Sequence, residues 1–253
     1  MEQDDRSLDI FGIKPISEAA NTAIEKSFAG IEGFLKRVCV PLLDELGLMM
    51  KDRIRLWRLN NILKTLDKAQ GKLEFIKDNL ELKAPPRIAL SIIENASLND
   101  DDEVQELWAG LFVSSCTKDG IDDSNLIFID LLKQLTKSEA RIFKYACETA
   151  IKVVSKNGLI TANELLLSPA DLETLTLIKD LYHLDREIDH LRSVEIIEPL
   201  GGGFNTQDVN LNANITPSSL ALNLYVRCQG FDGDPVNYWN LKNEEKPGDS
   251  NSN

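Results

Sequence analysis

A run of helical periodicity across residues 41–70 constrains the fold of this chain more than any other feature. The run reads PLLDELGLMMKDRIRLWRLNNILKTLDKAQ, and its apolar residues recur at spacings of three and four, as in an amphipathic helix. Pro41 suits the first turn of a helix, and Asp44 and Glu45 fall where the positive end of the helix dipole favours acids. A helix of this length spans about 45 Å. We therefore predict a mainly α fold with a long N-terminal helical pair.

The same region carries a charge opposite to that of the rest of the chain. Eight basic residues stand against three acidic ones between positions 51 and 77, whereas the whole chain has a net charge of −13. This division of charge predicts that the basic segment faces an anionic partner or the protein's own acidic part. The candidate partner or anion surface comprises Lys51, Arg53, Arg55, Trp57, Arg58, Lys64 and Lys68.

The sequence leaves several occupants of this surface open. Arginine pairs with phosphate and tryptophan stacks on bases, which is how a nucleic-acid site is built. An apolar helix side followed by lysine and arginine is also typical of a helix at a membrane surface. However, the cations at positions 51, 53, 55 and 58 spread around the helix and form no single stripe. This scatter favours contacts with solvent or with the chain's own acidic segment at residues 100–106.

The bulk composition indicates a globular helical protein. Hydrophobic residues make up 43% of the chain and glycines are few, which allows a sizeable core. The four cysteines are widely spaced in apolar surroundings, a pattern of buried thiols in a reducing compartment. The N-terminal segment is acidic and polar, unlike a signal peptide, and no window approaches the length of a membrane span. We expect a cytoplasmic protein.

The first part of the chain is predicted to be a helical domain over residues 17–135, after a flexible tail at 1–16. One helix starts after Ser17 and stops before Pro41, and another follows Pro85 and Pro86. Asn99 is the expected N-cap of the next helix, and Gly120 its expected end. A further helix is predicted from 122 to 135.

The second part is predicted to be a winged-helix-like module over residues 136–230. Capping boxes are expected at 136–139 and 161–164, and further helix starts at 168 and 216. A helix at 185–192, a strand at 194–198, a glycine turn and a return strand at 209–215 complete the order, with a short β-hairpin as the wing. Residues 231–253 are predicted to be a disordered tail.

Four blocks of the chain resemble the bacterial abortive infection alpha (Abi-alpha) family. They are VCVPLLDELGLMMKDRIRLWRLNNILKTLDKAQ, PPRIALSIIENASLNDDDEVQELWAGLFVSS, FIDLLKQLTKSEARIFKY and ITPSSLALNLYVRC. Their order and the surroundings of Trp57 and Trp108 carry the resemblance. It implies a helical protein with a role in stopping phage propagation, and it supplies no catalytic residues. The chain departs from the family pattern at Ser218 and Ser219, where a helix start that contains glycine is more usual.

The residue patterns favour contact over chemistry. The helix at 185–192 has more acids than arginines, so phosphates would repel it as a DNA reader. His183 and His190 are seven apart, but a helix that starts at Asp185 leaves His183 outside, so no metal site is expected. The glycine run at 201–203 lacks the lysine of a phosphate loop. We expect no catalytic residue and no cofactor.

The sequence and the resemblance together predict a non-enzymatic protein-interaction component of antiphage defence. A protein partner or self-association is the expected use of the basic surface. The alternatives are a nucleic-acid-binding regulator that uses the basic helix, and a peripheral-membrane effector of cell arrest.

Overall fold

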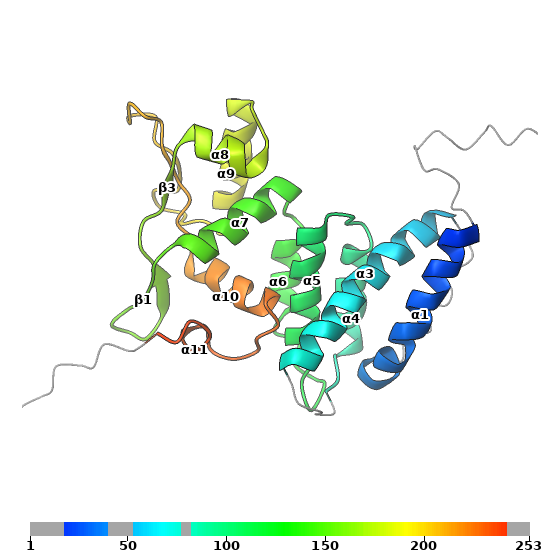
Figure 1. Ribbon diagram of the computed structural model, residues 1–253. Helices are drawn as coiled ribbons and strands as arrows, with labels where there is room; N and C mark the ends of the chain where they lie inside the picture. Colours follow the sequence, from blue (N-terminus) through cyan, green and yellow to red (C-terminus); the bar gives the residue numbers. More distant parts are fainter. Residues whose placement is uncertain (1–17, 40–52, 77–81, 242–253) are drawn as a thin grey trace, which may run out of the picture.

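The computed structural model describes residues 18–39, 53–76 and 82–241, which form a mainly helical protein with small antiparallel sheets (Figure 1). Helices α1 and α3 lie beside each other at one end of the molecule, and α8, α9 and a small sheet lie at the other. The helices that precede the first strand are α1 (Glu18–Val38), α3 (Arg53–Ile76), α4 (Pro86–Ala96), α5 (Asp102–Ser114), α6 (Leu126–Leu132) and α7 (Lys137–Thr149).

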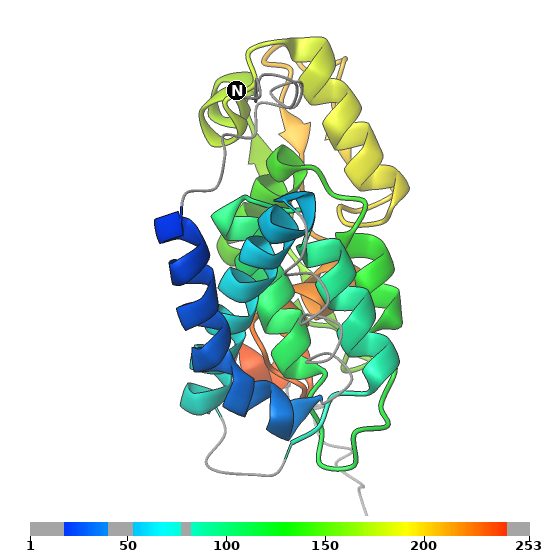
Figure 2. The ribbon, with the colours of Figure 1, turned by 90° about the vertical axis from the view of Figure 1, so that its right-hand side faces the viewer.

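Helix α5 is the interior helix on which the others pack. It contacts α3, α4, α6 and α7, and also α10 (Ser219–Cys228) from the C-terminal part. From Val104 to Ser114 only Glu106 is not buried, and Trp108 and Phe112 are among the largest fully buried side chains. A helix that is apolar on all sides has to be covered on all sides, and the turned view shows neighbouring helices around it (Figure 2).

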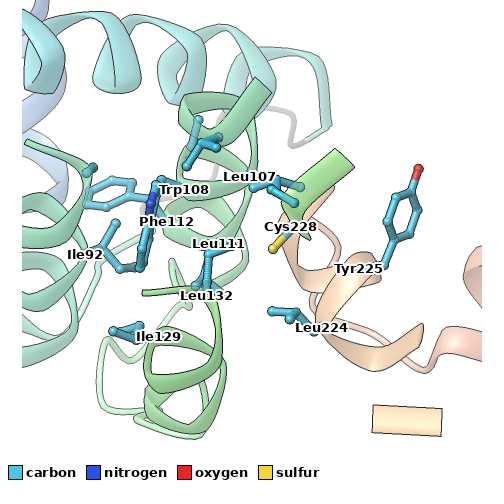
Figure 3. Close-up of a cluster of buried hydrophobic side chains, with 14 of the residues drawn as sticks. Ile92, Leu107, Trp108, Leu111, Phe112, Ile129, Leu132, Leu224, Tyr225 and Cys228 are labelled. Atoms are coloured by element: carbon cyan, nitrogen blue, oxygen red, sulfur yellow. The ribbon is translucent and has the colours of Figure 1, made fainter. Parts of the chain in front are cut away.

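The contact between α5 and α10 depends on Gly110. A Cβ atom at this position would lie 1.6 Å from the carbonyl oxygen of Cys228, so the two backbones touch because glycine has no side chain. Leu107 and Leu111 of α5 face Cys228 and Leu224 of α10 around this point (Figure 3). The closing helix of the C-terminal part is thereby joined directly to the central helix of the N-terminal part.

The C-terminal part contains two small sheets. Strands β1 (Lys152–Val154) and β2 (Ile160–Ala162) form an antiparallel hairpin after α7. The second sheet has the order β3-β5-β4, from β3 (Leu166–Leu167), β4 (Gly203–Phe204) and β5 (Ala213–Asn214). Helices α8 (Pro169–Thr176) and α9 (Leu181–Ser193) come between β3 and β4 in the chain and pack against α7.

Several predicted boundaries are confirmed. Helix α1 begins at Glu18, directly after Ser17, and α4 begins at Pro86. The capping box of Thr136 and Glu139 is present at the start of α7, and Ser168 caps α8 with Pro169 in its first turn. All four cysteines are buried. The predicted helix start at Pro41 lies outside the described residues, and α3 continues beyond the predicted end to Ile76.

Three predicted boundaries around α5 and α6 are wrong. Asp101, not Asn99, is the N-cap of α5, because its carboxylate accepts hydrogen bonds from the backbone N–H groups of Glu103 and Val104. The Asn99 amide instead donates to the carbonyl of Asn95 at the end of α4. Helix α5 ends before Gly120, since Thr117 leaves it to form a β-bridge with Lys83. Helix α6 covers only the middle of the predicted range.

The prediction for the C-terminal part also needs correction. Thr161 does not start a helix, because it lies in β2 opposite Val153. The Thr216 hydroxyl accepts a hydrogen bond from the backbone N–H of Leu165, so Ser218 caps α10 in its place. No strand forms over residues 194–198, apart from an isolated bridge at Ile197, and the return strand is shorter than predicted. Helix α9 starts at Leu181, so its length was underestimated.

The segment after α10 is folded in its described part, although the sequence predicts a tail from residue 231. Helix α11 (Pro235–Tyr238) brings Tyr238 and Trp239 against Tyr225 of α10, with ring centroids 6.4 and 5.9 Å from that of Tyr225. The ammonium of Lys152 lies over the Trp239 ring, as in a cation–π contact. Aromatic packing therefore extends the fold to residue 241.

None of the helices in the described ranges combines the length and the apolar character needed to cross a membrane.

Candidate interaction surface

Arg58 is the first cation of the basic segment whose side chain the structure describes. Lys51 lies outside the described residues, and Arg53 and Arg55 lie in the first turn of α3, where side-chain positions are not described. Trp57 is half-buried. The Nε atom of Arg58 donates to the hydroxyl of Ser97 at 2.9 Å. Arg58 thus ties α3 to the end of α4.

The cations at the end of α3 pair with the acids of α5. The Nζ atom of Lys68 lies 2.7 Å from a carboxylate oxygen of Asp102 and 3.0 Å from one of Glu106, and Lys72 lies 3.1 Å from the other Glu106 oxygen. These are the distances of charge-assisted hydrogen bonds. The sequence alternative in which the basic segment meets the chain's own acids at 100–106 is therefore confirmed for Lys68.

The pKa values of this cluster follow from the same contacts. Burial alone would lower the pKa of Lys68, but its hydrogen bonds to Asp102 and Glu106 raise that pKa above the ordinary value. Burial opposes the ionised form of Glu106 too, and hydrogen bonds from Lys68 and Lys72 reverse the effect and lower its pKa. Each group therefore favours the charged form of its partner.

Several acids of this region lie together because they form the start of α5. Asp101 caps α5, and Asp102 and Glu103 occupy its first turn, where the positive end of the helix dipole stabilises negative charge. The acidic first turn of α5 lies between α3 on one side and α7 on the other. Cations of both neighbouring helices therefore reach acids at the start of α5.

Lys64 is near enough to this cluster for its charge to help lower the pKa of Asp102, after the larger effect of Lys68. It is exposed and lines a hollow of about 290 Å³ between α1 and α3, together with Asp67 and Asn60. It stays a candidate for contact with a partner.

Helix α7 brings a second set of cations to α5, which the sequence reasoning missed. Lys137 lies 2.7 Å from Asp100, in a pair that is exposed on both sides. Arg141 lies 3.7 Å from Asp101 and 3.9 Å from Glu103, and Lys144 lies 3.9 Å from Glu103. A signal was present in the sequence, because positions 137, 141 and 144 fall on one face of a helix.

The N-terminus of α7 is fixed by α9 through buried glutamates. Glu187 of α9 accepts hydrogen bonds from the hydroxyls of Thr136 and Ser138, the latter at 2.6 Å, and contacts His183 at 3.1 Å. Glu139, which is 1% exposed, completes the capping box and contacts Nδ1 of His190 at 2.6 Å. Both histidines of the chain therefore take part in the junction between α7 and α9.

Both histidines lie within α9, which differs from the prediction for His183. His183 lies inside α9, one turn before Glu187, and not outside the helix as the sequence suggested. Within the described ranges, no three His, Cys, Asp or Glu side chains are grouped so that they could hold a metal ion. The polar residues of the junction bind one another and the start of α7.

Comparison with known proteins identifies a family. The family model described as abortive infection alpha matches residues 58–220, which is more than half of the chain and extends from α3 to α10. No curated protein and no solved structure matches the sequence.

Proposed function

The chain belongs to the abortive infection alpha family, and on this premise we propose that it is a non-enzymatic protein-interaction component of bacterial antiphage defence. Family membership supports the role in defence. The observation that favours protein contact is that part of the basic segment is paired within the fold: Lys68 and Lys72 are held by Asp102 and Glu106. A nucleic-acid regulator needs cations that can replace counterions on phosphates, and paired cations are poorly suited to that.

The C-terminal part points in the same direction. Its sheet order β3-β5-β4, with α7, α8 and α9 before the β4–β5 pair, supports a winged-helix-like arrangement. In such an arrangement α9 is the helix that would read DNA. Its exposed face mixes Asp185 and Asp189 with Arg186 and Arg192, and Asp189 pairs with Arg192. The balanced charge of this face fits a protein contact in the cytoplasm better than a duplex.

A phage challenge combined with purification of the protein tests the proposal. We expect an infected culture to lose fewer cells when the strain expresses the chain from its natural gene neighbourhood than when it does not. We also expect the tagged protein from infected cells to retain a specific protein partner or a second copy of itself. The readouts are plaque number and the composition of the purified complex.

Two further measurements separate the alternatives. Tight, salt-sensitive binding of the purified protein to a duplex or a single strand would replace the proposal with a nucleic-acid regulator. Co-sedimentation with anionic liposomes would replace it with a peripheral-membrane effector. Charge reversal by Arg53→Glu with Arg55→Glu tests the predicted surface itself, because unchanged protection and unchanged partner binding would remove that segment from the interface.

A further inference from the structure

Two cations of the second set, Arg141 and Lys144, border a hollow of about 370 Å³ between α5, α7 and α8. The hollow is lined by Glu103 of α5, by Arg141, Lys144, Tyr145 and Glu148 of α7, and by Thr174, Leu175 and the following Leu177. Its volume is within the range of sites that hold a small ligand or a few side chains of a partner.

The charged groups of the hollow are only loosely engaged by the protein. The distances of 3.7–3.9 Å from Arg141 and Lys144 to their carboxylates are about 1 Å longer than charge-assisted hydrogen bonds. Neither side chain donates a hydrogen bond to any residue in the described ranges. In contrast, the ammonium of Lys68 has carboxylate oxygens at 2.7 and 3.0 Å. Arg141 and Lys144 are therefore able to bind a carboxylate from outside without breaking a close ion pair.

The rest of the lining limits which ligand is suitable. Glu103 and Glu148 also face the hollow, so a ligand with several negative charges, such as a nucleotide, would be repelled by them. Tyr145 and Leu175 provide half-buried apolar surface. Leu177 is 75% exposed to solvent. Its backbone φ is 63°, a left-handed conformation that residues other than glycine adopt at a cost. Leu177 takes this conformation as the C-cap of α8, where its N–H donates to the carbonyl of Glu173, and it borders the hollow.

We propose that this hollow binds an extended peptide segment of a protein partner through an acidic side chain next to an apolar one. The acidic carboxylate accepts hydrogen bonds from the guanidinium of Arg141 and the ammonium of Lys144. The apolar side chain packs on Leu175, Leu177 and the ring of Tyr145. The proposal rests on the proposed function, for which it supplies a surface and the chemistry of the partner.

The test selects ligands from a random heptapeptide library displayed on a carrier, with the immobilised full-length protein. We expect the enriched peptides to combine Asp or Glu with a neighbouring aliphatic or aromatic residue. Binding of such a synthetic peptide should weaken about tenfold for each cation removed in Arg141→Ala and Lys144→Ala, the loss expected for a bond of about 1.4 kcal/mol. Lys137→Ala, which removes a cation of the same helix that does not line the hollow, is the matched control and should leave binding unchanged.

Several results would overturn the proposal. Enrichment of peptides without acidic residues, no enrichment at all, or equal binding by the double variant Arg141→Ala/Lys144→Ala would each do so. Inorganic phosphate is tested alone, and saturable binding of phosphate without any peptide binding would assign the hollow to a small anion. Thermal unfolding of each variant verifies that it is folded. Because peptide binding is measured without phage, its failure is distinct from a failure of the role in defence.

Discussion

The two sides of α5 differ in how they use charge. On the α3 side, Lys68 and Lys72 close on Asp102 and Glu106 at 2.7–3.1 Å. On the α7 side, Arg141 and Lys144 stay 3.7–3.9 Å from Asp101 and Glu103. In the basic segment, Lys68 and Lys72 are thus paired with acids inside the fold. On α7, Lys137 is paired with Asp100 at 2.7 Å, whereas Arg141 and Lys144 have no carboxylate closer than 3.7 Å among the described residues.

The reason for the difference is how each helix is positioned. Helix α7 has an attachment other than the charges of α5, because the buried Glu139 and Glu187 fix its N-terminus to α9. Helix α10 contacts α7 and meets the backbone of α5 at Gly110. Arg141 and Lys144 therefore contribute little to holding the helices together. Each prediction below tests one side of this comparison.

The largest effect is expected from Gly110→Ala. The new Cβ atom would overlap the carbonyl carbon and oxygen of Cys228. Because these are backbone atoms, which cannot rotate away as a side chain can, α5 and α10 have to separate. We expect a loss of about 3 kcal/mol in the free energy of unfolding, at the upper end of the cost of overpacking. Urea unfolding measures it.

Gly71→Ala in α3 is the matched control for that substitution. No atom lies within 4 Å of a Cβ placed at Gly71, so the exchange should increase stability by up to about 1 kcal/mol through helix propensity. Equal stability of the two variants would show that α5 and α10 are not in backbone contact.

Glu187→Gln tests how α7 is held. Burial alone would raise the pKa of Glu187, but hydrogen bonds from Ser138, Thr136 and His183 lower it below the ordinary value. Its stabilising contribution is therefore present above the pKa of the unfolded chain, about 4.3, and is lost as the pH falls through the lower folded pKa. We expect the variant to be less stable by about 2 kcal/mol at pH 7, and the difference to shrink at pH 3.

The exposed Asp189 on the same helix is the control, and Asp189→Asn should cost less than about 0.5 kcal/mol. A stability difference between wild type and Glu187→Gln that does not change between pH 7 and pH 3 would mean that the ionised carboxylate does not fix α7.

Asp101→Ala tests the start of α5, where both sets of cations converge. Loss of the N-cap should destabilise the protein by about 1 kcal/mol. Asn99→Ala should cost less, because the Asn99 side chain donates one hydrogen bond to the end of α4 and caps no helix. Thermal unfolding of both variants decides which residue is the cap, and a larger loss for Asn99→Ala would restore the prediction from sequence.

The sequence predicts the helical class and some of the caps, and it fails where the local signals are equal or where other contacts override them. The box of Thr136 and Glu139 and the Ser168–Pro169 start are confirmed. The same signals at Thr161 and Thr216 start no helix, because Thr161 pairs with Val153 in a strand and Thr216 accepts a hydrogen bond from the backbone of Leu165. Asn99 and Asp101 are equally good caps by residue type, and the structure separates them because the Asn99 amide bonds back to Asn95 while Asp101 accepts from Glu103 and Val104. Strands of two or three residues are too short for a period of two to show.

The site is less predictable than the fold for a physical reason. Ion pairing depends on which helices are neighbours, and the sequence does not give the distance between Lys68 and Glu106 or between Lys144 and Glu103. Charge counts along the chain therefore located the basic segment but not the cations left available. The signal that the sequence does contain is the shared helix face of Lys137, Arg141 and Lys144, which is opposite in charge to the acidic segment at 100–106.

A pair of double-mutant cycles measures the difference between the two sides most directly. One cycle combines Lys68→Met with Glu106→Gln, and the other combines Lys144→Met with Glu103→Gln, all by urea unfolding at low salt. We expect a coupling free energy of about 0.5–1 kcal/mol for Lys68 and Glu106, and one within about 0.3 kcal/mol of zero for Lys144 and Glu103. Equal couplings, or a larger coupling between Lys144 and Glu103, would contradict the account.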